Sequence, residues 1–192
     1  IYVGCEGGVD ADLALPVSHV DNGYDSAMSL TVKDLKGGHS GVDIHKNRAN
    51  AIKLLGRVLA TLSQACDFKI ADIKGGSLRN AIARESVATL AINGADKEQF
   101  LATLSNIIKD IESEIGTAEP KLSITAEDTE RPDTVIENSQ TVINLINVLP
   151  SGVVRYSDNI ADVVETSLSF GVLGVAKGEL VATLLVRSLT QV

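Results

Sequence analysis

The order in which two hydrophobic periodicities alternate along residues 26–128 restricts the possible folds of this chain more than any other feature. The segment 26–35 ("SAMSLTVKDL") alternates apolar and polar side chains, which predicts a strand with one buried face. Over 46–65 the apolar residues recur at three- and four-residue intervals, which predicts a helix. Two further strands are then predicted at 68–76 and 85–92.

A second helix and a final strand complete the pattern. Asp96 followed by Gln99 resembles a capping box, which predicts that a helix begins here. The apolar stripe of that helix consists of Phe100, Leu104, Ile107, Ile108, Ile111 and Ile115. The segment 121–127 ("KLSITAE") alternates again. The resulting order, β-α-β-β-α-β, predicts an α+β fold with a ferredoxin-like sandwich core, in which helices cover one face of an antiparallel sheet.

The segments on both sides of this core add to it. Residues 11–20 are predicted to be extended, and Asn22-Gly23 is a strong signal for a hairpin turn. After residue 128 the pattern predicts a helix, a strand and a long hairpin, at 138–149, 153–156, and 163–174 with 180–189. No linker or low-complexity tract divides the chain. We therefore expect one domain over 1–192, with an extended antiparallel sheet and an additional helix.

Charge and composition argue against several classes of partner. The net charge is −8 and the 17 basic residues are scattered, whereas nucleic-acid binding needs clustered Lys and Arg. No apolar run approaches the ~20 residues of a membrane span, and no signal peptide opens the chain. Cys5 and Cys66 lack metal-binding or redox spacing, which favours free thiols and a cytoplasmic protein. Both ends resemble interrupted strands, so we expect a segment of a larger protein.

The loop that follows the first core strand carries two of the three histidines, His39 and His45. Their spacing lacks the HExxH pattern of a zinc helix, and His19 has no cysteine or paired carboxylates beside it, so we predict no metal site within this chain. Gly37-Gly38 and Gly41 flank His39 and permit a tight turn that holds the imidazole away from its strand. A histidine held there could donate a hydrogen bond to an oxyanion. The alternative is a loop residue that packs against backbone carbonyls.

Two motifs resemble those of a known family. The stretches "GGHSGVDIHKNRANA" (37–51) and "GGSLRNAIARE" (75–85) are similar to aminoacyl-histidine dipeptidases, the Xaa-His branch of the dizinc M20 metallopeptidases. Enzymes of this family consist of a catalytic domain with two zinc ions and an inserted lid, or dimerisation, domain with a ferredoxin-like core. The resemblance implies that residues 1–192 are this lid domain. It also implies that the zinc ligands and the catalytic glutamate lie in a catalytic domain of the same protein, outside this segment.

The same resemblance implies roles for three residues. His39 matches the histidine that hydrogen-bonds the scissile carbonyl oxygen as it becomes an oxyanion. Asn80 and Arg187 match lid residues that contact the carboxylate of a dipeptide substrate, and a guanidinium suits that task because it can bind a carboxylate through two nitrogens. Asn47 and Ala83 depart from the family pattern, in which we expect glycine and proline.

Two functional hypotheses follow. The first is the lid of a cytoplasmic, zinc-dependent dipeptidase that hydrolyses Xaa-His dipeptides and forms a homodimer through the lid; the isolated segment should be inactive. The second is a stand-alone ferredoxin-like module for small-ligand binding or dimerisation. In either case we expect structural roles for His45 and Arg48 and solvated side chains for Lys36 and Arg79. An ordinary solvated strand charge remains the alternative for Arg187, which we expect to share an outward strand face with residues such as Leu185.

Overall fold

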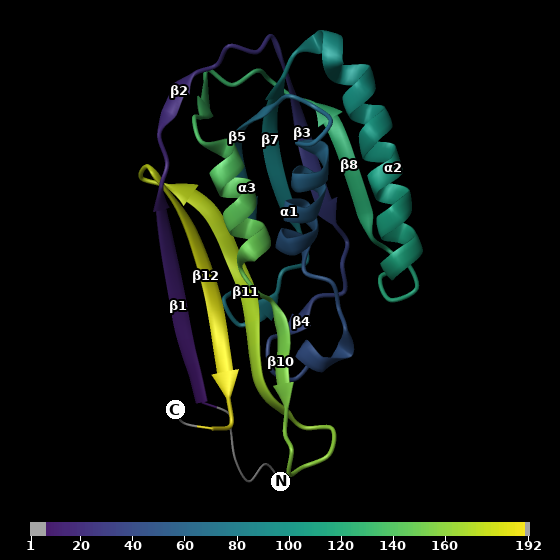
Figure 1. The fold of residues 1–192 in the computed structure, drawn as a ribbon, viewed down its shortest axis with the longest axis vertical. Coiled ribbons are helices and arrows are strands. Elements are labelled where there is room, and N and C mark those ends of the chain that lie inside the picture. The colour runs from purple at the N-terminus through teal and green to yellow at the C-terminus, as the bar shows by residue number, and fades with distance from the viewer. Residues whose placement is uncertain (1–6, 191–192) are drawn as a thin grey trace.

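The computed structural model describes residues 7–190, so Cys5 and most of the interrupted strand expected at the start of the chain lie outside the described residues (Figure 1). The elements of the predicted core occur in the predicted order, as β3 (Ser26–Lys33), α1 (Ala51–Leu62), β5 (Lys69–Gly75), β7 (Ser86–Ile92), α2 (Lys97–Ile115) and β8 (Ser123–Asp128). Their strands form an antiparallel sheet in the order β5-β7-β3-β8. This is the strand order of a ferredoxin-like sandwich, and the predicted fold class is confirmed.

Three long strands extend the core: β1 (Gly7–Pro16), β12 (Glu179–Ser188) and β11 (Val164–Ala176) lie side by side, and with the short strand β10 (Gly152–Tyr156) they complete an eight-stranded sheet. The predicted long hairpin is β11–β12. Strand β10 pairs with β11 outside this row. The extension joins the core where β11 pairs with β5: Leu173 lies opposite Gly75, and Gly174 lies opposite Lys74. The C-terminal end of β12 thereby comes close to the loop that follows β3.

The three helices lie together on one face of the sheet (Figure 1). The additional helix, α3 (Ser139–Val148), packs against α1 at Gly56, where a methyl group would lie 2.5 Å from Ile146 Cγ2. Side chains between helices and sheet make one continuous apolar core, whose largest fully buried members include Met28, Leu30, Leu55, Leu59, Ile73, Phe100 and Phe170. No helix in the described part of the chain is both long and apolar enough to cross a bilayer.

The hairpin predicted at Asn22-Gly23 is wrong. The strand before it, β2 (His19–Asp21), pairs with β9 (Thr134–Ile136), while β3 pairs with β7 and β8. Asn22 instead is buried: its side chain accepts a hydrogen bond from Tyr24 N (2.9 Å) and donates one to Pro132 O (2.8 Å). Both edges of β3 already pair with core strands, so β3 has no vacant edge with which β2 could form a hairpin.

The predicted start of α1 at residue 46 is also wrong. A short 3-10 turn, η1 (Ile44–Lys46), is followed by Asn47 with φ of 51°, a left-handed conformation that interrupts the helical path. The helix begins only at Ala51, because the Asn50 side chain accepts a hydrogen bond from Ile52 N (3.0 Å) and so acts as N-cap.

The second helix begins as predicted, at Lys97 directly after Asp96, but not for the predicted reason. The Asp96 side chain makes no capping hydrogen bond. Gln99 does not complete a capping box either, because its amide donates to the carbonyl oxygen of Ala65 at 3.0 Å. The apolar stripe, and not the cap, is therefore what the sequence predicts correctly: Phe100, Leu104, Ile107 and Ile111 are buried, and Ile108 and Ile115 are partly buried.

Candidate functional site

A short two-stranded ladder brings the two motifs together. In it β4 (Gly38–His39) pairs with β6 (Ala81–Ile82), so that His39 lies opposite Ala81. Gly38 has φ of 148° and a methyl group there would lie 2.4 Å from Arg48 Nη1. Only a residue without a side chain fits this position, and the glycine therefore allows the chain to turn into β4.

The His39 imidazole is oriented by its own loop. Its Nδ1 accepts hydrogen bonds from the backbone N–H groups of Gly41 and Val42, each at 3.1 Å. Because Nδ1 is an acceptor, the proton of the neutral ring lies on Nε2. The side chain is exposed. The loop thus holds an exposed ring through Nδ1, and among residues 7–190 the ring donates no hydrogen bond to a backbone carbonyl.

Asp43 stabilises the same loop. Its Oδ2 accepts a hydrogen bond from His39 N (2.9 Å), and its Oδ1 contacts Lys46 Nζ (2.8 Å) and Arg48 Nη2 (3.2 Å). The hydrogen bond from Lys46, followed by that from the His39 backbone, lowers the pKa of Asp43 to about 2. Arg48 also donates to the carbonyl of Gly37. Asp43 and Arg48 are therefore internal supports of the loop, which agrees with the structural role expected for Arg48.

Ser40 connects the three residues predicted for the site. It is 1 % exposed; its N–H donates to the carbonyl of Asn80 (2.9 Å), and its Oγ accepts from Arg187 Nε (3.3 Å). His39, Asn80 and Arg187 are thus gathered around one buried serine, although Arg187 is 147 positions away from it. The sequence analysis missed this contact, because no local pattern links Ser40 to a strand so far along the chain.

Arg187 lies at the end of β12, opposite Gly8 of β1 and Ser167 of β11, and is half-buried. A methyl group on Gly41 would lie 3.2 Å from its Cδ and Nε and 3.4 Å from His39 Nδ1, so the loop passes between these two side chains. Nε donates a hydrogen bond to Ser40, and the two Nη nitrogens have no hydrogen-bond or ion-pair partner among residues 7–190. The expectation that Leu185 shares an outward face is wrong, because it is only 5 % exposed.

Asn80 is an exposed residue in the turn between β5 and β6. The residue before it, Arg79, is not simply solvated as expected, because its guanidinium forms an ion pair with Asp10 on β1. The hydrogen bond to Asp10 raises the pKa of Arg79. This pair attaches the turn that carries Asn80 to the edge strand of the extended sheet.

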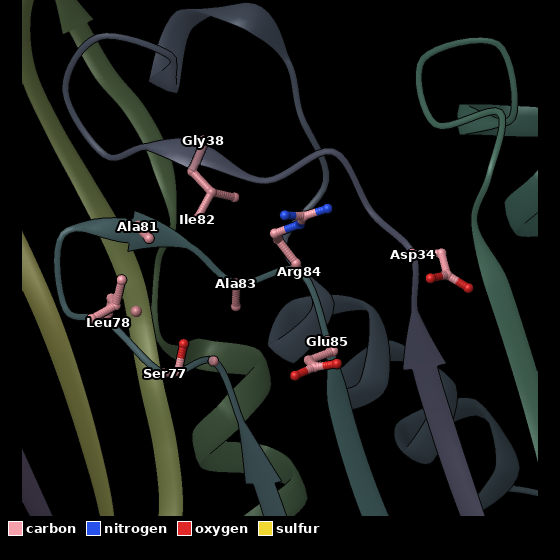
Figure 2. A pocket seen from close by; sticks show the side chains of 11 residues that line it. Asp34, Gly38, Ser77, Leu78, Ala81, Ile82, Ala83, Arg84 and Glu85 are labelled. Atoms are coloured by element: carbon pink, nitrogen blue, oxygen red, sulfur yellow. The ribbon is translucent and has the colours of Figure 1, made fainter.

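A cavity of about 390 Å³ lies beside the β4–β6 ladder (Figure 2). Gly38 and Ile82 form one side of it, and Asp34, Ser77, Arg84 and Glu85 contribute its polar groups. His39, Asn80 and Arg187 are not among its lining residues. The candidate site is the His39–Asn80–Arg187 group, which we call the lid cluster, and not this cavity; His39 and Asn80 are exposed and Arg187 is half-buried.

The described residues contain no group of three or more His, Cys, Asp or Glu side chains arranged to hold a metal ion. In the lid cluster itself, histidine is the one common metal ligand, and its Nδ1 already accepts two backbone hydrogen bonds. The described part of the chain does not by itself fit a zinc centre.

Comparison with known proteins places this chain in a family. Residues 30–121, which include β4, α1 and β6, match the family model of the M20 peptidase dimerisation domain. The chain is 40% identical to the cytosol non-specific dipeptidase of Escherichia coli (strain K12). The alignment is 194 residues long and covers 98% of this chain. The chain belongs to the M20 peptidase dimerisation-domain family.

The fold of this M20 dimerisation domain also matches a solved structure. It superposes on the crystal structure of aminoacylhistidine dipeptidase from Vibrio alginolyticus with a TM-score of 0.94 and 35% sequence identity, over 99% of this chain. The chain spans 40% of the length of the Escherichia coli relative and 39% of the Vibrio chain. The similarity therefore includes the additional helix and the extended sheet as well as the ferredoxin-like core.

Proposed function

We propose that this M20 dimerisation domain is the lid of a cytoplasmic, zinc-dependent dipeptidase that hydrolyses Xaa-His dipeptides. The observation that carries the proposal is the lid cluster, in which Ser40 joins a loop with an oriented histidine to the backbone of Asn80 and to the guanidinium of Arg187. The relatives support it by their names, one a cytosol non-specific dipeptidase and the other an aminoacylhistidine dipeptidase.

In this proposal His39 stabilises the charge that develops on the substrate. As the peptide carbonyl carbon becomes tetrahedral, its oxygen gains negative charge, and the Nε2–H of His39 donates a hydrogen bond to that oxygen. The two backbone hydrogen bonds to Nδ1 fix the ring orientation before substrate arrives. Such a preorganised donor contributes roughly 3 kcal/mol to transition-state stabilisation.

Arg187 and Asn80 bind the free carboxylate at the C-terminal end of the dipeptide. The Nη nitrogens of Arg187 face a carboxylate in the paired geometry that guanidinium groups favour, and Ser40 holds Nε so that this edge of the group stays oriented. The Asn80 amide adds a neutral donor. Because Arg187, Asn80 and His39 belong to one chain, substrate carboxylate and scissile carbonyl contact the same lid.

The proposal includes a second domain and a second subunit. Two zinc ions and their ligands lie in a catalytic domain of the same protein, outside these 192 residues, and supply the Lewis-acid chemistry when bound. The lid contributes substrate binding and one hydrogen-bond donor, and it forms a homodimer. The isolated lid is then expected to be inactive.

The test is the steady-state kinetics of His39→Ala in the full-length protein. Loss of the donor should lower kcat on Xaa-His dipeptides by about 10²-fold or more. The matched control is His45→Ala, which removes an exposed histidine from the same loop and should leave kcat within about two-fold of wild type. A wild-type kcat for His39→Ala would refute the assigned role.

A further inference from the structure

A buried carboxylate lies below the loop that carries His39. Glu119, in the connection between α2 and β8, is 1 % exposed. Its Oε2 accepts a hydrogen bond from Lys36 N at 2.9 Å, and its Oε1 accepts one from Ala49 N at 3.0 Å. A carboxylate withdrawn from water is costly unless hydrogen bonds compensate it, and bonds to a charged acceptor are stronger than neutral ones.

The two partners of Glu119 flank the loop on both sides. Lys36 directly precedes and Ala49 directly follows residues 37–48, which include β4, His39 and η1. One side chain from a distant part of the chain, 83 and 70 positions away, thus bonds both ends of this loop. Arg84 supports the first end as well, since its Nε donates to Leu35 O at 3.1 Å.

We propose that Glu119 is a positioning residue that closes the base of the 37–48 loop and thereby sets where His39 presents its Nε2–H. The inference rests on the proposed role of His39 as hydrogen-bond donor to the substrate. Such a donor acts only within a narrow range of positions, and a shift of about 1 Å can cost up to 10²-fold in rate. The bonds from Gly41 N and Val42 N orient the ring relative to its own backbone. The β4–β6 ladder and the bonds of Ser40 hold the middle of the loop against the domain, whereas Glu119 fixes its two ends.

The experiment is a double-mutant cycle in the full-length enzyme with Glu119→Gln and His39→Ala. Glutamine keeps the shape of the side chain but turns an NH₂ group towards one of the two backbone N–H donors, which breaks that bond. Glu119→Gln should lower kcat about 10-fold. In the His39→Ala background the same substitution should change kcat by less than about two-fold, because the group it positions is gone.

A second measurement does not depend on activity. Amide hydrogen exchange in the full-length enzyme should become faster in Glu119→Gln for the peptide that covers residues 36–49. The matched control is Glu112→Gln, an exposed glutamate of α2, which should change neither exchange in that peptide nor kcat. If Glu119→Gln does not fold, Glu119→Asp serves for both measurements, since it keeps the charge but shortens the reach by one methylene.

The outcomes separate the two proposals. Equal losses of kcat from Glu119→Gln in the wild-type and His39→Ala backgrounds, or unchanged exchange at 36–49, would overturn the positioning role while leaving His39 as the donor. A wild-type kcat for His39→Ala would overturn the proposed function itself, and the exchange measurement would still decide whether Glu119 closes the loop.

Discussion

The contact between Ser40 and Arg187 predicts how substrate binding responds to one missing hydroxyl. Ser40→Ala removes the acceptor for Arg187 Nε but leaves the backbone bond from Ser40 N to Asn80 intact. Hydrogen bonds to charged groups contribute about 1.5–3 kcal/mol. Because this bond is 3.3 Å long and Arg187 is half-buried, we expect the lower value, about 1.5 kcal/mol, which corresponds to a roughly tenfold change in binding.

The assay compares dipeptides with a free and an amidated C-terminus in the full-length enzyme. Ser40→Ala should raise KM about tenfold for the free dipeptide and change it little for the amidated one. Ser169→Ala is the matched control, since Ser169 is also fully buried but its Oγ has no hydrogen-bond partner within residues 7–190. Ser169→Ala should leave KM unchanged for both the free and the amidated dipeptide. The reasoning would be refuted if Ser40→Ala raised KM equally for the two substrates, or if it left KM for the free dipeptide unchanged.

Three further predictions concern stability. Asn50→Ala removes both the cap of α1 and the bond from Asn50 Nδ2 to Phe170 O (2.8 Å), so the free energy of unfolding should fall by about 2–3 kcal/mol in urea titrations. Gly76→Ala should lower Tm strongly, because the added methyl would lie 1.9 Å from Gly171 O at a φ of +62°. Asp43 has its pKa lowered by folding, so its contribution is present above its ordinary pKa near 4 and is lost as pH falls towards about 2. The protection of the His39 amide against exchange, measured relative to the intrinsic rate at each pH, should therefore fall over that range, and unchanged protection would contradict this.

The core could be predicted from the sequence because its periodicity is local. The alternation in 26–33 and the apolar stripe beginning at Phe100 each depend on one element burying one face. The Asn22-Gly23 hairpin failed because strand pairing depends on which edges are vacant, and that is decided by strands far away in the chain. The start of α1 failed because Asn47 breaks the helical path in a segment whose side-chain pattern is still compatible with a helix.

The candidate site was predictable only in part. Glycines on both sides of His39 signalled a loop that exposes a histidine, and the family motifs pointed to Asn80 and Arg187. The contacts that organise these residues were not predictable, since Ser40 meets Arg187, and Glu119 meets Lys36, only after β12 and the α2–β8 connection have folded against the loop. A buried polar residue has no local sequence signature that identifies its distant partner.

The most direct test of the lid proposal is a crystal structure of the full-length enzyme with a phosphinate analogue of an Xaa-His dipeptide, whose phosphinyl oxygen imitates the oxyanion. The account predicts that His39 Nε2 lies about 2.7–3.1 Å from that oxygen, with the Nη nitrogens of Arg187 on the analogue's carboxylate. A complex in which the phosphinyl oxygen is bound by other donors and His39 remains in solvent would contradict it.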